Sequence, residues 1–409
     1  MKQYFRNFRI IDADKDFSGD LIATDGIITD IFPRDHSTKH EHDTDCDLML
    51  DGKGKLVLAA GLIDMHAHFR DPGFLRKETL ESASIAAACG GYTTAVCMAN
   101  TRPVTAGIKA AKAIKERADV LGLIDLYPAI CLTKNMQGKS LSNFLEQKTC
   151  NTNSMDFVRL LSEDGKDVQD DALFLAALKK AALFNLPVSC HCDLNGENSA
   201  VKRAVKIGKI SGCALHIAHI STKQSVEFIR ALKADGQCKI SAEATPHHIA
   251  LNSVCAKKLG ADTFGKVAPP LRSEQDRMAV IEGLRDGTID AIATDHAPHT
   301  FRDKQNGAPG FCGIETAFAV CYSVLCKEHG FSLQKLMSLM SSSPAKLLGF
   351  TDRGKLEKGL RADFTLIDTQ EQWNIAGDKL HSKGKNTPYS GNFSGKIVMT
   401  FCAGKISSG

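Results

Sequence analysis

The sequence predicts an α/β fold: a (β/α)8 barrel of the TIM type beside a small β-sandwich-like domain formed by the N- and C-terminal segments. Through the middle of the chain, short apolar runs alternate with helix-like stretches. The two ends instead carry β-like pieces separated by turn residues. No glycine-rich phosphate loop follows the first apolar run, which an open doubly wound sheet would be expected to carry.

Eight apolar runs are the candidate strands of the barrel. They cover residues 56–64, 92–98, 123–131, 156–162, 186–190, 213–218, 239–244 and 289–294. Continuous apolar strands that alternate with helices are typical of a parallel sheet buried on both faces. Eight such units in one stretch of chain favour a closed (β/α)8 barrel over residues 56–350.

Helical stretches lie between these runs. The sequence predicts helices over residues 169–184, 222–234, 274–286 and 315–329. In the second of these, Val226, Ile229 and Leu232 recur at the spacing of one helix face. The third follows Ser273, a favoured N-cap residue, and stops before Gly287.

The two ends of the chain are predicted to form one composite β domain. Residues 1–55 contain β-like pieces with Asp25-Gly26 as a hairpin turn. Residues 361–368 and 396–405 have the same character. We therefore expect residues 1–55 and 351–409 to pair beside the barrel.

Composition and charge argue against several classes of protein. The net charge is +4 with both signs interspersed and no basic run, so we expect no nucleic-acid partner. The N-terminus lacks an apolar signal core, and the uncharged stretch 82–101 is split by Gly90-Gly91, so we expect no membrane segment. The 14 cysteines are scattered without a CxxC pair, which indicates reduced, buried thiols in a cytoplasmic protein.

Metal-ligand residue types follow five of the predicted strands at their C-terminal ends. These residues are His66, His68, Asp164, His191, His219 and Asp295. In a barrel the C-terminal ends of the strands converge on one face, where the chemistry of this fold lies. Imidazole and carboxylate ligands without paired thiolates suit zinc or a similar divalent ion. A lone histidine is usually structural, but six such groups at one face predict a metal site.

An ordered series of motifs gives this prediction its specificity. The series comprises residues 61–73 (GLIDMHAHFRDPG), 98–103 (MANTRP), 162–165 (SEDG), 191–192 (HC), 219–223 (HISTK), 245–248 (TPHH), 293–299 (ATDHAPH) and 384–388 (GKNTP). It resembles the dihydroorotases of the amidohydrolase superfamily over nearly the whole chain.

The resemblance implies a role for each matching residue. His66, His68 and Asp295 would hold one zinc ion, His191 and His219 a second, and Asp164 would bridge the two. Asp295 would also act as the catalytic proton carrier, and Arg70, Asn100 and His299 would bind a substrate carboxylate. We choose Asp164 over Glu163 because it directly precedes Gly165. Arg70 lies two residues beyond His68, hence on the same side of an extended segment.

Neighbouring histidines and cysteines are assigned no ligand role. We expect His247 and His248 to pack or to support the ligands, and His296 to face away from Asp295. We expect Cys190 and Cys192 to point away from His191 and to pack, because side chains alternate along a strand.

The implied activity is the reversible, zinc-dependent cyclisation of N-carbamoyl-L-aspartate to L-dihydroorotate in de novo pyrimidine synthesis. Two departures concern substrate recognition: Ala268 stands where the family has Asn, and the loop 307–313 is one residue shorter than the family pattern. Two alternatives therefore stay open. One is another cyclic amidase of the hydantoinase or allantoinase type. The other is a non-catalytic homologue that scaffolds aspartate transcarbamoylase. A homodimer and an association of the enzyme itself with that transcarbamoylase are further options.

Overall fold

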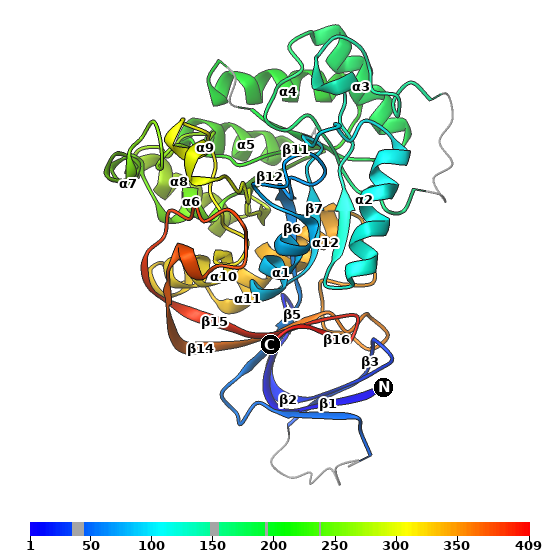
Figure 1. The fold of residues 1–409 in the computed structure, drawn as a ribbon, viewed down its shortest axis with the longest axis vertical. Helices are drawn as coiled ribbons and strands as arrows, with labels where there is room; N and C mark the ends of the chain where they lie inside the picture. Colours follow the sequence, from blue (N-terminus) through cyan, green and yellow to red (C-terminus); the bar gives the residue numbers. More distant parts are fainter. Residues whose placement is uncertain (35–44, 148–154, 193–194, 237–238) are drawn as a thin grey trace.

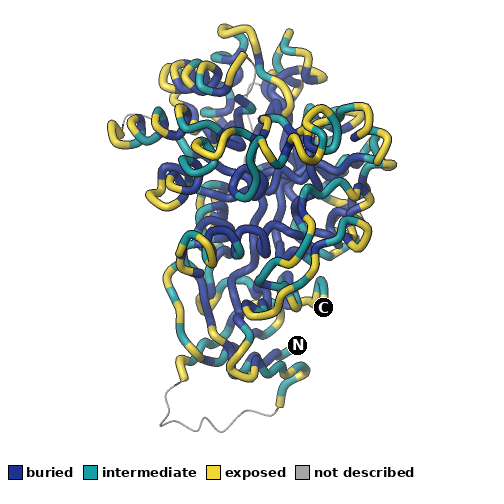
Figure 2. The backbone as a smooth tube through the Cα atoms, turned by 90° about the vertical axis from the view of Figure 1, so that its left-hand side faces the viewer, coloured by how far each residue is buried: buried dark blue, intermediate teal, exposed yellow. Residues whose placement is uncertain are grey.

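The structure is a computed structural model that describes residues 1–34, 45–147, 155–192, 195–236 and 239–409. A barrel of strands and helices makes up the larger part, and a β-sheet containing both termini lies beside it (Figure 1). Buried backbone runs through the barrel and continues into this sheet, whereas exposed backbone lies mainly on outer helices and loops (Figure 2). Within the described ranges, no helix combines the length and the apolarity needed to span a bilayer.

Eight parallel strands form the barrel. They are β6 (Leu62–Ala67), β7 (Tyr92–Cys97), β8 (Asp125–Pro128), β9 (Leu161–Ser162), β10 (Val188–Cys190), β11 (Leu215–Ile217), β12 (Ile240–Ala244) and β13 (Ala291–Ile292). They pair as β6-β7-β8 and as β9 to β13. Single bridges, Ile130 with Leu161 and Ala67 with His296, join the two groups and close the barrel. The predicted barrel is therefore confirmed.

A buried carboxylate supports the seam between β6 and β13. Asp64 is fully buried, and its Oδ1 accepts hydrogen bonds from the backbone N–H of His66 (3.1 Å) and of Thr294 (3.0 Å). Burial raises the pKa of Asp64 to about 6, against the opposing effect of its hydrogen bonds. Asp64 therefore ties together the strand ends that carry His66 and Asp295.

Helices surround the barrel strands. The longer ones are α1 (Leu80–Cys89), α2 (Ile108–Leu121), α3 (Asp171–Leu183), α4 (Glu197–Ser211), α5 (Lys223–Asp235) and α8 (Glu274–Asp286). The three helices predicted over 169–184, 222–234 and 274–286 correspond to α3, α5 and α8. Ser273 caps α8 through a reciprocal capping box with Asp276.

Shorter helical segments complete the outer layer. They are α6 (Pro246–Ala250), α7 (Ser253–Leu259), α9 (Phe301–Gln305), α10 (Ala317–Cys321), α11 (Leu333–Met337) and α12 (Ser343–Leu347). The helix predicted over 315–329 begins as α10 and continues over Tyr322–Glu328 as wider π-helical turns. A second π-helical segment, Ser338–Ser342, joins α11 to α12.

The predicted first strand, residues 56–64, is wrong as a single element. It divides at Gly61 into β5 (Val57–Ala60) and β6, which belong to different sheets. The Gly61 N–H donates to Asp363 O, whereas the next N–H, of Leu62, donates to Gly91 O in the barrel. A Cβ at Gly61 would lie 2.4 Å from Thr93 Oγ1, so only glycine fits this crossing. A continuous apolar run carries no signal for which sheet each residue joins.

Both ends of the chain enter one eight-stranded sheet. The remaining strands are β1 (Lys2–Ile11), β2 (Asp16–Thr24), β3 (Ile27–Pro33), β4 (Leu48–Asp51), β14 (Phe364–Ile375), β15 (Gly391–Cys402) and β16 (Lys405–Ser408). The order is β16-β15-β14-β5-β1-β2-β3, with β4 beside β1. Asp25 and Gly26 both have positive φ, as the predicted hairpin turn between β2 and β3 requires.

Aromatic packing holds this sheet together at its centre. Phe5 meets Phe364 and Phe401 edge-on, with ring centroids 4.7 and 5.1 Å apart. Because β5 pairs with both β1 and β14, residues 57–60 lie in this sheet, beyond the boundary expected at residue 55. The division into a composite domain of residues 1–55 with 351–409 and a barrel of 56–350 stays a prediction.

Candidate metal centre and active site

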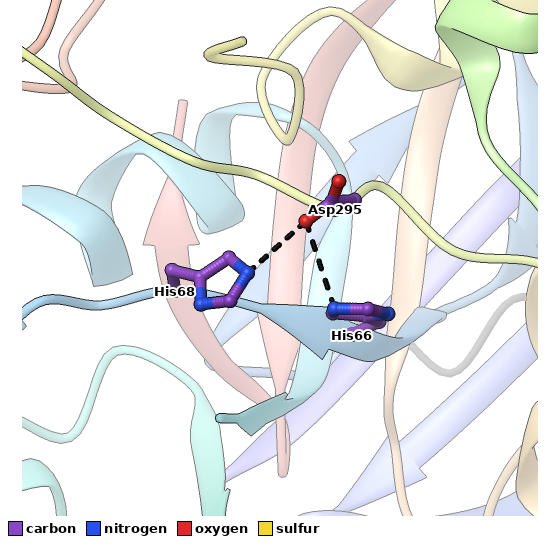
Figure 3. Close-up of side chains that lie close together, drawn as sticks. All are labelled: His66, His68 and Asp295. Atoms are coloured by element: carbon purple, nitrogen blue, oxygen red, sulfur yellow. Dashed lines mark hydrogen bonds and ion pairs between the residues drawn. The ribbon is translucent and has the colours of Figure 1, made fainter. Parts of the chain in front are cut away.

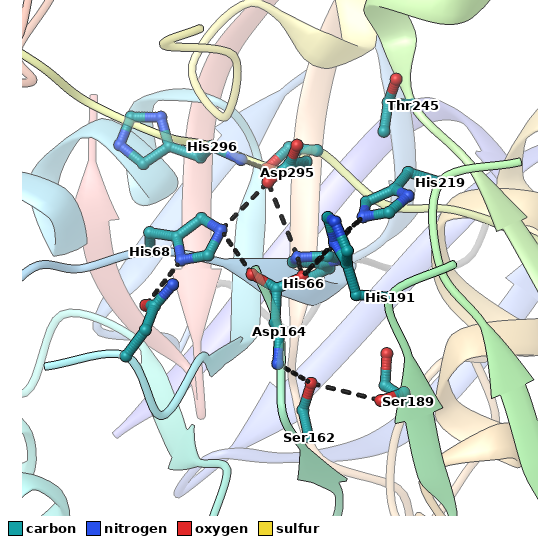
Figure 4. Close-up of polar contacts among 12 residues, drawn as sticks. His66, His68, Ser162, Asp164, Ser189, His191, His219, Thr245, Asp295 and His296 are labelled. Atoms are coloured by element: carbon teal, nitrogen blue, oxygen red, sulfur yellow. Dashed lines mark hydrogen bonds and ion pairs between the residues drawn. The ribbon is translucent and has the colours of Figure 1, made fainter. Parts of the chain in front are cut away.

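The residues expected as metal ligands converge at one mouth of the barrel. His66 is the penultimate residue of β6 and His68 directly follows the strand. Asp164 follows β9, His191 follows β10, and His219 and Asp295 follow β11 and β13. Their side chains point toward a common centre (Figure 4). All six side chains are buried or nearly so, with His191 the most exposed at 12%.

Two overlapping groups of donor atoms share this centre. Asp295 Oδ1 lies 3.0 Å from His68 Nε2 and 3.6 Å from His66 Nε2 (Figure 3). Asp164 Oδ1 lies 3.1 Å from His66 Nε2, 3.4 Å from His191 Nδ1 and 3.8 Å from His219 Nε2. The other oxygen, Asp164 Oδ2, lies 3.3 Å from His68 Nε2. Asp164 therefore faces both groups at once.

These donor atoms fit a divalent metal. Two ligands about 2.0–2.1 Å from a tetrahedral zinc ion lie about 3.3 Å apart, close to the observed separations. His66 Nε2 and Asp164 Oδ1 are buried and lack a hydrogen-bond partner among the described residues. Buried polar atoms are normally satisfied, so a cation between them accounts for both. His66, His68 and Asp295, and likewise His66, Asp164 and His219, are close enough to hold one ion.

The charges around His66 also favour a bound cation. Burial alone lowers the pKa of His66, but Asp164 and Glu243 outweigh it and raise the pKa well above its ordinary value. Conversely, burial raises the pKa of Asp295, but the hydrogen bond from His68 and the nearby imidazoles lower it overall. A centre that draws protons onto its imidazoles attracts a metal ion by the same field.

Positive backbone φ angles direct several of these side chains. His219 has φ of 35° and Asp295 of 45°, in the left-handed region that non-glycine residues seldom adopt. Such conformations cost about 1 kcal/mol or more and cluster at functional sites. Arg70 has φ of 59°, so the expectation that it continues an extended segment beyond His68 is wrong. It nevertheless lines the same cavity as the ligands, because the chain turns there.

Partners on the far ring nitrogens orient the first two histidines. His66 Nδ1 lies 2.7 Å from Glu243 Oε1, and His68 Nδ1 lies 3.0 Å from Asn100 Oδ1. Each oxygen accepts the Nδ1 proton, which leaves Nε2 as the ring atom that faces the centre and would bind a metal ion once it has lost its own proton. Asn100, expected to bind substrate, therefore also positions His68.

Glu243 is the functional residue that the sequence analysis missed. It lies in β12, is fully buried, and also accepts from His216 Nε2 at 2.9 Å. Burial would raise the pKa of Glu243, but the charge of His66 and the two histidine hydrogen bonds lower it to about 2. A glutamate between two alanines of a predicted strand was the available signal, because a charge facing a barrel interior needs a partner.

Glu163 and Asp164 point to different places. Glu163 Oε2 accepts from the backbone N–H groups of Leu132 (2.9 Å) and Thr133 (3.1 Å), and Oε1 accepts from the Thr133 hydroxyl. Both carboxylate oxygens of Glu163 therefore accept hydrogen bonds from the loop at Leu132 and Thr133. Asp164, not Glu163, faces the histidines.

A cavity of about 220 Å³ opens beside the candidate ligands. Arg70, Asn100 and His299 line it, together with Ala268 and Pro309 from the two segments that depart from the family pattern. Arg70 forms no ion pair with a carboxylate in the described ranges, and its Nε is buried without a partner. An unpaired guanidinium in a cavity of this size is suited to an anionic ligand.

The histidines and cysteines without an expected ligand role lie apart from the donor atoms. His296 Nδ1 accepts from Gly313 N (3.2 Å), and His248 contacts Thr245 Oγ1 (2.8 Å) and Pro269 O (3.1 Å). His247 packs against Phe311. Cys190 and Cys192 are buried in the main hydrophobic core.

Comparison with known proteins agrees with this geometry. The sequence pattern of the amidohydrolase family matches residues 57–407. A dihydroorotase of Clostridium botulinum (strain Eklund 17B / Type B) is 38% identical, over 99% of both chains. A dihydroorotase of Bacillus thuringiensis (strain Al Hakam) is 36% identical, over 100% of this chain and 98% of that protein.

A solved structure extends the likeness to the whole fold. The L-hydantoinase (dihydropyrimidinase) of Arthrobacter aurescens superposes with a TM-score of 0.85 over 99% of this chain and 95% of that one, at 23% identity. At that identity the superposition bears on the fold alone. The family pattern and the full-length sequence relatives go further: the chain belongs to the amidohydrolase family, and within it to the dihydroorotases.

Proposed function

We propose that this protein is a metal-dependent dihydroorotase that interconverts N-carbamoyl-L-aspartate and L-dihydroorotate in pyrimidine synthesis. The main support for this substrate is Arg70, whose guanidinium lies in the cavity beside the metal centre without a carboxylate partner among the described residues. Both compounds bear a carboxylate that a guanidinium binds through two parallel N–H donors. A neutral ring such as hydantoin offers no such partner. The full-length likeness to two dihydroorotases supports the same choice.

The proposed metal centre holds two zinc ions. His66, His68 and Asp295 would hold one ion, His191 and His219 the other, and Asp164 would bridge them. Such ions lower the pKa of water from 15.7 to about 7 and polarise an amide carbonyl. Glu243 and Asn100 would hold the Nδ1 protons of His66 and His68, so that each Nε2 could release its proton and bind the metal.

Asp295 is the proposed proton carrier. Its Oδ1 faces His66 and His68. Burial raises its pKa, but the hydrogen bond from His68 together with the nearby imidazoles outweighs that effect and lowers the pKa overall, which favours the carboxylate form. In ring opening it would take a proton from the attacking water and deliver it to the leaving ring nitrogen. In ring closure it would carry the proton in the opposite direction. The substrate carboxylate would be held by Arg70, Asn100 and His299. This would place the amide group of the substrate next to Asp295.

The decisive experiment compares substrates on the zinc-loaded protein. We expect ring closure of N-carbamoyl-L-aspartate and ring opening of dihydroorotate, with little turnover of hydantoin or allantoin. Turnover of a neutral ring alone would contradict the dihydroorotase assignment. Metal binding without any turnover would favour the scaffolding homologue. A cytoplasmic location, a homodimer and an association with aspartate transcarbamoylase stay predictions from the sequence.

A matched pair of variants tests whether Arg70 binds the substrate carboxylate. Arg70→Met should lower kcat/KM for the acidic substrate on the order of 100-fold, because two charge-assisted hydrogen bonds are lost. Arg102→Met removes the same charge nearby from an exposed side chain that stacks on Phe74 at 5.4 Å. This control should keep kcat/KM within about twofold, as surface substitutions usually have small effects. Equal effects of the two changes would remove Arg70 from the substrate site.

A further inference from the structure

Lys77 lies against one of the two ring nitrogens of His299. Its Nζ lies 3.1 Å from His299 Nδ1. An ammonium group has only donors, so Nδ1 must accept and the ring proton must lie on Nε2. The other side of the ring agrees, because His299 Nε2 lies 2.9 Å from the carbonyl oxygen of Pro309, which can only accept. Two independent contacts thus require the same tautomer.

This tautomer changes the meaning of the contact between His299 and Arg70. Arg70 Nη2 lies 3.5 Å from His299 Nε2, and both atoms bear hydrogen. Neither can accept from the other, so the contact places two donors side by side. Both residues line the cavity beside the metal centre, as does Pro309. Pro309 O accepts the Nε2 proton in this structure, and a carboxylate oxygen seated between Nη2 and Nε2 would share that proton while it accepts from Arg70.

We propose that Lys77 is a positioning residue of the substrate site: by holding the His299 proton on Nε2, it makes His299 and Arg70 a joint donor pair for the substrate carboxylate. The proposal rests on the proposed function and adds a residue that does not line the cavity. With the opposite tautomer, His299 Nε2 would accept from Arg70 and would present a lone pair to the anion.

The charges around His299 are consistent with a neutral ring. Burial is the largest effect, and the positive charges of Arg70, Lys77 and Lys304 act in the same direction, lowering the pKa of His299 to about 3. Asp303 opposes them from α9, where it lies 3.7 Å from Lys77 Nζ and accepts from Thr300. His299 therefore serves as a neutral donor over the whole physiological range.

Kinetics of three zinc-loaded variants test the proposal. Lys77→Met should raise KM for the acidic substrate about tenfold while kcat stays within about twofold, as expected when one ground-state donor is misoriented. Lys77→Arg keeps a donor toward Nδ1 and should restore most of the affinity. Arg76→Met, the matched control, removes a neighbouring exposed charge and should leave KM unchanged.

Two further measurements separate a tautomer effect from general damage. Ring ¹⁵N NMR of the zinc-loaded wild type, assigned by comparison with His299→Gln, should show a protonated Nε2 and an unprotonated Nδ1 for His299. In Lys77→Met both tautomers of His299 should be populated. The pH profile of kcat/KM should then show an additional ionisation on its acidic limb, which the wild type lacks. A wild-type His299 with its proton on Nδ1 would overturn the proposal even if Lys77→Met failed to fold.

The outcomes also distinguish this proposal from the proposed function. Normal KM in Lys77→Met, with wild-type turnover of N-carbamoyl-L-aspartate, would refute the role of Lys77 and leave the activity standing. Absence of that turnover in the wild type would refute the function, whereas the NMR spectrum would still report the tautomer.

Discussion

Replacing Glu243 should weaken metal binding although Glu243 is not itself among the candidate ligands. Its two oxygens accept from His66 Nδ1 at 2.7 Å and from His216 Nε2 at 2.9 Å, in a fully buried position. Glu243→Gln keeps the shape and can still offer one oxygen to His66, but it removes the charge. Glu243→Ala removes both acceptors and leaves the Nδ1 proton of His66 without a partner.

The magnitude follows from the kind of bond that is lost. Partners that orient metal-bound histidines typically contribute 10- to 100-fold in affinity, or about 1.4–2.7 kcal/mol. A hydrogen bond to a charged group is worth about 1.5–3 kcal/mol, which agrees. We therefore expect the zinc Kd to rise about tenfold in Glu243→Gln and about 100-fold in Glu243→Ala.

Competition with a chromophoric zinc chelator at fixed pH measures these constants. Glu315→Gln is the control, because Glu315 also pairs with a histidine, His381 at 3.0 Å, but belongs to a different part of the molecule. It should bind zinc like the wild type. If both Glu243 variants bound zinc within twofold of the wild type, the reasoning that Glu243 orients His66 would be refuted.

Two other predictions concern Asp295 and Lys304. Asp295→Asn should lower kcat by about 10²- to 10⁴-fold, the range for a lost general base, while elemental analysis still finds bound metal; near-normal turnover would remove Asp295 from the mechanism. Lys304 is fully buried against the carbonyls of Lys266, Ala308 and Gly310, and burial lowers its pKa to about 8 from 10.5. Between about pH 8 and pH 10.5 Lys304 is protonated in the unfolded chain but largely deprotonated in the folded protein. The free energy of unfolding should therefore increase as the pH rises through this range. Urea unfolding should show this gain in the wild type but not in Lys304→Met, and a pH-independent difference between them would contradict it.

Much of the site could be predicted because its signals are local. A metal-ligand residue directly after an apolar run marks the C-terminal end of a strand, and the barrel brings such ends together. The positions of His191 and His219 follow from that rule alone. The choice of Asp164 over Glu163 rested on one neighbouring glycine, and the hydrogen bonds of Glu163 to the loop at Thr133 explain the orientation of both residues.

Other features depend on segments that are distant in sequence. Glu243 and His66 are 177 residues apart, and Lys77 and His299 are 222 apart. Local patterns carry no information about such pairs. A buried charged side chain needs a partner, but which residue becomes that partner depends on the fold. Arg70 shows the same limit for the backbone, since its positive φ of 59° departs from the extended conformation expected at that position.

The sequence by itself determined the alternation of strands and helices, the positions of the six candidate ligands and the likeness to dihydroorotases, because periodicity and ordered motifs are properties of neighbouring residues. Only the tertiary structure decided that the apolar run 56–64 divides at Gly61 between two sheets and that both chain ends share one of them. It also decided that His299 donates from Nε2. The physical reason is that strand pairing and tautomer choice depend on which distant hydrogen-bonding groups meet, and packing alone brings those groups together.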